Sequence, residues 1–135
     1  MIRDTHHNLG TASGETNDMG RFLKHSGTWL EMLLERKTAD GEVVIDYELG
    51  MGYNEHGNSQ AMHGRWKVAS WHFSKAIDTF QKLPHYVETM MGWPAANKGL
   101  MHWILGDYEA AKRTFIDIIN VFHMHNGVDD ILSFK

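Results

Sequence analysis

The chain has 135 residues, of which 42% are hydrophobic and 22% are charged, and these proportions are typical of a single soluble globular domain. A net charge of −4 gives no basic footprint for nucleic acid or an anionic membrane, and no apolar run approaches the roughly 20 residues that span a bilayer. The chain lacks cysteine, and its opening MIRDTHHNLG lacks the apolar core of a signal peptide, so we expect an intracellular, cytoplasmic protein.

Residues 5–37 form the first predicted pair of helices, which is the weakest copy of a pattern that recurs along the chain. Residues 8–10 (NLG) parallel residues 97–99 (NKG), and residues 17–18 (ND) stand where we expect the turn between the two helices. Apolar residues at helical spacing then predict the second helix of this pair: Phe22, Trp29, Leu30, Leu33 and Leu34. Residues 43–45 (VVI) are interpreted as an extended lead-in to the next helix.

Two further pairs of helices are predicted over residues 46–83 and 86–126, and residues 127–135 form a C-terminal stub. Short segments that contain glycine, MHGR and LGDY, separate the two helices of each pair, as a tight helical hairpin requires. The four predicted helices cover residues 46–62, 66–82, 86–105 and 107–126.

Two residues bear on the ends of the helices in the third pair. Pro94 either kinks the helix predicted over residues 86–105 or lies in its first turn, because proline lacks the amide proton that a helix interior requires. Asp107 is the expected N-cap of the last helix, which should end near Asn126 and Gly127.

The second and third pairs are copies of each other, because residues 57–80 recur at 99–122, 42 positions later. The matched positions hold glycines and apolar residues at helical spacing: Gly57/Gly99, Gly64/Gly106, Trp66/Tyr108, Ala69/Ala111, Phe73/Phe115, Ile77/Ile119 and Phe80/Phe122. A period in this range is typical of stacked helical pairs that cannot bury their apolar faces alone. The predicted fold class is therefore all-α, with about three antiparallel helix pairs in a single domain over residues 1–135.

This pattern resembles the tetratricopeptide repeat family. The resemblance is carried by a glycine in the first helix, Gly-Arg-Trp or Gly-Asp-Tyr at the turn, and Ala–Phe–Ala or Ala–Phe–Ile down the second helix. The period and the linkers are similar to those of the kinesin-light-chain-like branch, including its fungal members. The resemblance covers residues 5–126, although Ser26 and Trp29 replace an expected aromatic and an expected small residue in the first unit. It implies a right-handed α-solenoid.

The resemblance also implies a concave groove, lined by the first helix of each pair, that takes an extended or helical peptide. It assigns two sets of residues to this groove: Met51, Asn54, Asn58 and Ala61 from the second unit, and Trp93, Ala96, Leu100 and Trp103 from the third. Asn8 and Asn97 match asparagines that hydrogen-bond a peptide backbone in this branch, and an amide offers a donor and an acceptor side by side. For Trp93 and Trp103, packing between helices is the alternative that we favour over contact with a ligand.

Ten histidines raise the alternative of a metal site. His56, Gln60 and His63 share one predicted helix face, and the pair His123 and His125 at a helix end is the best candidate for metal binding. The sequence contains no HExxH and no glutamate followed three residues later by histidine, which are the zinc and di-iron patterns of helices. We therefore interpret most histidines as packing or surface residues, and we expect no metal, no cofactor and no catalytic residue.

The leading hypothesis is a non-enzymatic module for protein–protein interaction that holds a peptide or a partner helix in the groove. The alternative from another class is a small helical ligand-binding protein or enzyme that encloses an apolar small molecule and uses histidines. A third interpretation makes the chain part of a longer repeat array. Because no solvating helix follows the last pair, we expect its uncovered face to pair with a second copy in a homodimer. Nucleic acid and membranes are not expected as partners.

Overall fold

The computed structural model describes residues 16–85 and 88–126, and its elements are helical: α2 (Thr16–Glu35), α3 (Tyr47–Met62), α4 (Trp66–Gln81), the 3-10 helix η1 (Glu88–Met91), α5 (Gly92–Ile104) and α6 (Tyr108–Asn126). Within those ranges the only β-type pairing is an isolated antiparallel bridge between Lys37 and Val43. The prediction of an all-α chain is therefore confirmed for the part that the structure describes.

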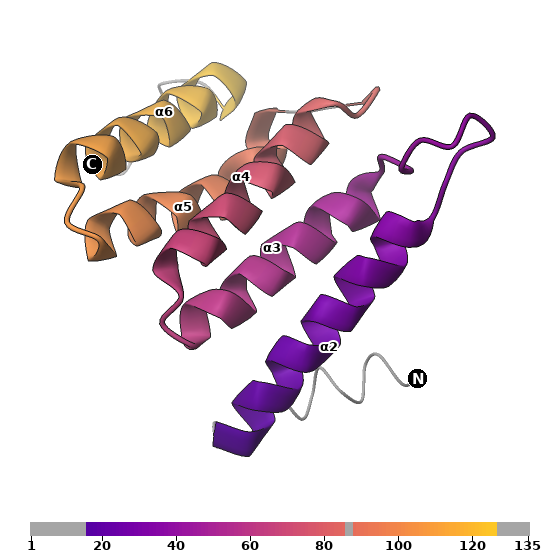
Figure 1. Ribbon diagram of the computed structural model, residues 1–135. Coiled ribbons are helices and arrows are strands. Elements are labelled where there is room, and N and C mark those ends of the chain that lie inside the picture. The colour runs from indigo at the N-terminus through magenta and orange to yellow at the C-terminus, as the bar shows by residue number, and fades with distance from the viewer. Residues whose placement is uncertain (1–15, 86–87, 127–135) are drawn as a thin grey trace.

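The α-helices lie side by side in the order in which they occur along the chain (Figure 1). Each helix runs antiparallel to the one before it, from α2 in indigo to α6 in yellow (Figure 1). Contacts join α2 with α3, α3 with α4, α4 with α5 and α5 with α6, and α3 also touches α5. The packing is therefore largely between neighbours in sequence, as short connections between antiparallel helices favour.

Aspartate side chains begin two of the predicted helices. α3 starts at Tyr47 because Asp46 is its N-cap, and the Asp46 carboxylate accepts a hydrogen bond from the Leu49 amide at 2.9 Å. α6 starts after Asp107, whose Oδ1 atom accepts a hydrogen bond from the Ala110 amide at 3.3 Å. The predicted N-cap of the last helix is thereby confirmed.

Two helix boundaries differ from the prediction. α2 begins at Thr16, so residues 17–18 lie within its first turn, where the Asp18 carboxylate suits the positive end of the helix dipole. The helix expected from residue 86 begins instead at Gly92, after η1. Pro94 lies buried in the first turn of α5, so the second of its two predicted alternatives is correct.

Glycines in the left-handed region make the two tight turns between paired helices. Gly64 has a φ of 74° between α3 and α4, and Gly106 has a φ of 84° between α5 and α6. Residues with a Cβ rarely adopt this backbone conformation, so the predicted role of both glycines in tight connections is confirmed.

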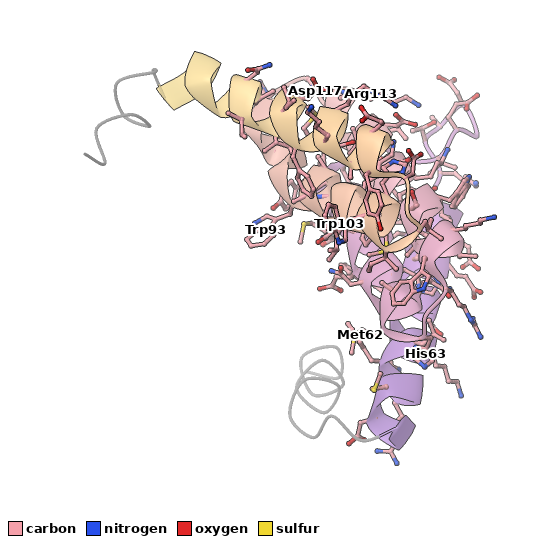
Figure 2. The ribbon with its side chains drawn as sticks, turned by 90° about the vertical axis from the view of Figure 1, so that its left-hand side faces the viewer. Met62, His63, Trp93, Trp103, Arg113 and Asp117 are labelled. Atoms are coloured by element: carbon pink, nitrogen blue, oxygen red, sulfur yellow. The ribbon has the colours of Figure 1, made fainter. Side chains whose placement is uncertain are left out.

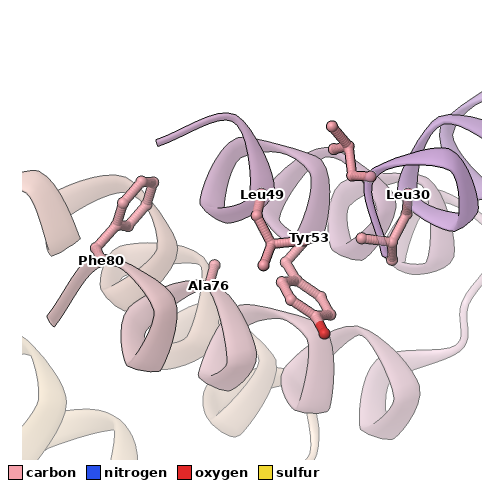
Figure 3. Close-up of a cluster of buried hydrophobic side chains, with 6 residues drawn as sticks. Leu30, Leu49, Tyr53, Ala76 and Phe80 are labelled. Atoms are coloured by element: carbon pink, nitrogen blue, oxygen red, sulfur yellow. The ribbon is translucent and has the colours of Figure 1, made fainter. Parts of the chain in front are cut away.

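The buried core has no single centre. It is divided among the interfaces between neighbouring helices. Its larger cluster joins α2, α3 and α4 through apolar side chains (Figure 3): Leu30, Leu33, Leu49, Tyr53, Ala76 and Phe80. A second cluster joins α4 to α5 through Ala69, Phe73 and Met101. Each cluster is formed where one helix packs on the next, and burial of this apolar surface is the main source of stability.

Candidate functional site

A groove with a volume of about 490 Å³ opens between α3 and α5, with contributions from α2 and α4. Its lining is mostly apolar: Phe22, Glu55, Asn58, Ala61, Met62, Trp66, Phe73, Asn97, Leu100, Met101 and Ile104. Glu55 is the one ionised side chain among these described lining residues, and two amides supply the remaining polar groups. Apolar walls with a few polar groups are the usual composition of a binding site for an apolar or mixed ligand.

Helical spacing explains why these residues meet. Asn58, Ala61 and Met62 lie three and four residues apart on α3, and Asn97, Leu100 and Ile104 follow the same spacing on α5. Residues at this spacing share one helix face, and the contact between α3 and α5 brings the two faces to the same groove.

Four of the residues that the sequence assigned to a groove line it together. Asn58 and Ala61 come from α3, and Asn97 and Leu100 come from α5. These are the residues that the structure brings into one site.

A hydrogen bond between two predicted asparagines joins the helices on either side of the groove. The Asn97 Nδ2 atom donates to the Asn54 Oδ1 atom at 3.2 Å. Asn54 is only 7% exposed, whereas Asn97 is half-buried and also lines the groove. A side-chain amide carries two N–H donors and an oxygen acceptor, so this bond occupies only one of the donors of Asn97.

Both predicted tryptophans are largely exposed, and packing between helices, the alternative that we favoured for them, is wrong for Trp93. Trp93 is 79% exposed, and its side chain projects away from the helices (Figure 2). Trp103 is 57% exposed, and its ring centroid lies 4.8 Å from that of Tyr108 at the start of α6, so it packs partly between the two helices of its pair. Neither residue is among those that line the groove, although Trp93 lies on the same face of α5 as Asn97 and Leu100, one and two helical turns before them.

The other predicted positions lie elsewhere. Met51 is half-buried and packs against the cluster that joins α2, α3 and α4. Ala96 is half-buried on α5 and is not among the residues that line the groove. Asn8 lies outside the described residues.

Sequence reasoning missed several residues of the groove. Met62 and Ile104 could have been found, because they are 42 positions apart and occupy the same place in the two copies of the repeat. Phe22 comes from α2, where the first unit matches the repeat too weakly for any such correspondence. Trp66, a recognised repeat position, was interpreted only as a packing residue.

A buried polar network extends from α2 across α3 to the start of α4, on a different side of α3 from the groove. The Ser26 hydroxyl lies 2.8 Å from His56 Nδ1 and 2.8 Å from the Ser59 hydroxyl, and His56 Nε2 lies 3.1 Å from the amide nitrogen of Gln60. Arg65 donates to the Gln60 amide oxygen at 3.3 Å. The replacement of an expected aromatic by Ser26 in the first unit is explained by this network.

The hydrogen-bond partners assign the His56 tautomer. Because Arg65 holds the Gln60 amide oxygen, the Gln60 nitrogen faces His56 and donates to its Nε2 atom. The His56 proton is therefore on Nδ1 and is donated to Ser26. The chain of donors ends where Ser59 donates to the Glu55 carbonyl oxygen at 3.1 Å.

Burial and charge keep His56 neutral. Desolvation lowers its pKa to about 4, and the nearby His72 and Arg65 add to the effect. Burial also lowers the pKa of His72, although its hydrogen bond to the Val68 carbonyl oxygen opposes the shift. The two imidazole rings meet edge to face at 4.8 Å. These rings are packing groups, as the sequence predicted for His56.

The described histidines neither gather with other potential metal ligands nor line the groove. No group of three potential ligands occurs in the described residues, and no histidine is among the described groove residues. His63 donates through Nδ1 to the Ser59 carbonyl oxygen at 3.0 Å, so it does not face His56 as a second ligand. The side chains of His123 and His125 lie outside the described residues.

Within the described ranges, none of the helices combines the length and the apolar character needed to cross a membrane. Comparison of the chain with protein-family models, with curated proteins and with solved structures found no match.

Proposed function

We propose that this protein is a tetratricopeptide-like interaction module, a right-handed stack of about three antiparallel helix pairs that acts inside the cell without catalysing a reaction. The proposal is supported by the 42-residue repeat and by the antiparallel order of α3, α4, α5 and α6 (Figure 1). The observation that carries its function is the groove between α3 and α5, because four residues assigned from sequence meet in it.

The ligand is a peptide segment with apolar side chains, extended or helical. Its apolar side chains would be buried against Leu100, Ile104 and Met62, and burial of that surface would drive binding. Asn58 and Asn97 would exchange hydrogen bonds with the peptide backbone at the polar part of the groove. Glu55 is the only charged side chain among the described lining residues, so these residues offer no basic group to bind a C-terminal carboxylate. An internal peptide segment is therefore favoured over a free C-terminus.

A displayed library of random peptides tests this function. The immobilised full chain is used for selection, and the affinity of an enriched peptide is then measured by fluorescence polarisation. Leu100→Glu places a charge in the groove and is expected to weaken binding at least tenfold. Leu105→Glu is the matched control, because Leu105 caps the same helix, is similarly exposed and does not line the groove.

The outcomes of this experiment separate the groove from other surfaces. Loss of binding in Leu100→Glu with retention in Leu105→Glu supports the groove. Equal binding by both variants, or no enriched peptide, contradicts the proposal. An Asn97→Ala variant then tests the amide, with an expected loss of about threefold to tenfold from one backbone hydrogen bond.

A further inference from the structure

The face of α5 that lines the groove continues beyond it. Four residues on this face are spaced by four, three and four positions, which places them in one stripe along the helix: Trp93, Asn97, Leu100 and Ile104. The last three line the groove, and Trp93 lies one helical turn before them. The stripe is about 16 Å long, because each residue of a helix adds about 1.5 Å. It therefore reaches further along α5 than the groove does.

α3 carries the same stripe one repeat earlier. Each of its four residues lies 42 positions before its counterpart on α5: Met51, Glu55, Asn58 and Met62. The two helices are in contact and run in the same direction, because each described helix is antiparallel to the one before it (Figure 1). Met62 and Trp93 accordingly lie on the same side of the molecule (Figure 2). We call these eight residues the double stripe, and none of them is buried.

The double stripe is apolar at both ends and more polar between them. Met51 and Trp93 are equivalent positions at one end. Met62 and Ile104 are equivalent positions at the other end. The three polar members lie between the ends: Glu55, Asn58 and Asn97. A ligand that covers the double stripe therefore needs an apolar side chain at each of its own ends and polar groups in its middle.

This distribution of polar groups does not suit an extended ligand. An extended chain needs about five residues to cover the length of the double stripe, and each residue brings an N–H donor and a C=O acceptor. The ends of the double stripe offer these groups no polar side chain, and in the middle Asn97 already donates one N–H to Asn54. A backbone group that is buried without a partner costs free energy. A helix pairs its own backbone groups, so it covers apolar ends without this cost.

The spacing of the double stripe also matches that of a helix. A ligand helix that lies along α3 and α5 passes from one end of the double stripe to the other in about 11 residues, because all three helices have the same rise per residue. Its residues i, i+4, i+7 and i+11 share one face, so residues i and i+11 reach the two apolar ends. Peptide helices that dock in a hydrophobic groove use anchors at such spacings.

Charge narrows the ligand further. Glu55 is the only charged member of the double stripe, and its charge is negative. A basic side chain at i+4 or i+7 of the ligand is attracted to this carboxylate, whereas an acidic side chain is repelled. The double stripe therefore fits a helix with apolar ends and a positive middle.

We propose that the groove binds an amphipathic helix of a partner protein, with apolar residues at i and i+11 and a basic residue between them, and that Trp93 anchors one end of this helix. Trp93 is 79% exposed, more than any other large apolar side chain in the described residues. Burial of such an aromatic ring is a main source of affinity at an interface. The inference rests on the proposed function, because it names the ligand of that groove and extends its site over the double stripe.

The peptide enriched on the immobilised full chain is the probe for the helical conformation. A proline at its centre is expected to weaken binding about tenfold or more, because proline breaks a helix, whereas an alanine at the same position should leave binding unchanged. Circular dichroism of the mixture should show more helix than the sum of the separate spectra. Replacement of the central basic residue of the peptide by glutamate should weaken binding about threefold to tenfold at low salt and less at high salt.

Trp93→Ala tests the anchor and is expected to weaken binding of this peptide about tenfold. Trp71→Ala is the matched control, because Trp71 is a tryptophan on α4 that is 56% exposed and belongs neither to the double stripe nor to the groove lining. Alanine at one terminal anchor of the peptide should remove the effect of Trp93→Ala, and alanine at the other should not, because only one anchor contacts the ring. Circular dichroism of both unbound variants establishes that they are helical.

The outcomes separate this inference from the proposed function. If Leu100→Glu abolishes binding while Trp93→Ala and the proline-containing peptide bind as well as their parents, the groove stands and the helical ligand is overturned in favour of a short extended segment. An equal loss of affinity in Trp93→Ala and Trp71→Ala also overturns the inference. If the full chain enriches no peptide, the proposed function fails and this inference fails with it.

Discussion

Phe73 packs its ring directly against Gly57, and the same relationship recurs between Phe115 and Gly99 in the next copy of the repeat. A Cβ atom added to Gly57 would lie 2.6 Å from Cε1 of Phe73, and one added to Gly99 would lie 2.9 Å from Cε1 of Phe115. Real Cβ atoms do not approach a ring so closely, so each glycine sets the distance between the two helices of its pair.

Gly57→Ala is therefore expected to destabilise the protein, even though alanine favours a helix. Overpacking costs about 1–3 kcal/mol and the gain in helix propensity is about 1 kcal/mol, so the net loss is up to about 2 kcal/mol. Gly99→Ala should cost less, because Phe115 is exposed at one side and has room to move, whereas Phe73 has none. Urea unfolding of both variants measures the difference.

Gly20→Ala is the control for both substitutions. Gly20 lies in α2, and nothing stands within 4 Å of the position that its Cβ would take. We expect this variant to gain up to about 1 kcal/mol from helix propensity alone. Equal effects at positions 20 and 57 would show that the ring of Phe73 does not constrain the helix.

Ser26 and Ser59 should differ in their contribution to stability although both hydroxyls are buried. Ser26→Ala removes the acceptor for the His56 Nδ1 proton and leaves a buried donor unpaired, at an expected cost of about 1–3 kcal/mol. Ser59→Ala should cost less, because Ser26 still reaches the Leu23 carbonyl oxygen at 3.0 Å. Thermal unfolding of the two variants at pH 7 ranks them, and the reverse order would contradict the assigned tautomer.

The stability of the protein should decrease as the pH is lowered through the range in which His56 gains a proton. Its pKa is about 4 in the folded chain and 6.5 when unfolded, so the unfolded chain binds more protons between these values. The stabilisation is complete above pH 6.5 and is lost as the pH falls toward 4. The lowered pKa of His72 acts in the same direction.

His56→Gln tests this pH dependence. The variant should be less stable at pH 7 but should lose less stability between pH 6.5 and 4.5, because glutamine does not bind a proton. His85→Gln, at an exposed position in the connection after α4, is the control and should retain the wild-type slope. Urea midpoints at three pH values suffice, and parallel slopes for wild type and His56→Gln would contradict the prediction.

Asp46 has two functions that conservative substitutions can separate. It caps α3, and Arg36 donates to both of its carboxylate oxygens at 3.0 Å. Burial raises the pKa of the Asp46 carboxyl, but the hydrogen bonds from Arg36 and from the Leu49 amide outweigh that effect and lower it.

Asp46→Ala removes the cap and the ion pair and should cost about 1–2 kcal/mol. Asp46→Asn keeps the cap and should cost less than about 1 kcal/mol, because the ion pair is partly exposed. Guanidinium unfolding at low salt distinguishes the two variants. If Asp46→Asn is as costly as Asp46→Ala, the ion pair with Arg36 contributes more than the cap.

The helices were predictable where local chemistry decides them. Asp107 begins α6, and Gly64 and Gly106 make their turns, because a cap and a left-handed glycine act within a few residues. Pro94 was compatible with either a kink in the helix or a position in its first turn, and only the packing of α5 against its neighbours selected the first turn. Residues 17–18 suit a turn and a helix N-terminus equally well.

Part of the groove was also predictable from the sequence. Asn58 and Leu100 were found because the family resemblance assigned these positions to a groove, and both line the groove between α3 and α5. Trp93 was misjudged because the size and hydrophobicity of tryptophan favour burial, and sequence alone does not show that no described helix covers that edge of α5. The bond between Asn54 and Asn97 depends on two helices meeting, which no single-helix pattern contains.

The described helices follow one another in space as they do in sequence, and among them only the contacts of α3 with α5 and of η1 with α6 skip a helix. Few long loops must therefore close before native contacts form, and the entropy of loop closure opposes folding only weakly. Helical proteins with such local contacts fold in microseconds to milliseconds. Successive hairpins then form with partial independence, so α6, which packs on α5 and η1 alone, should exchange its amide protons before α3 and α4 do.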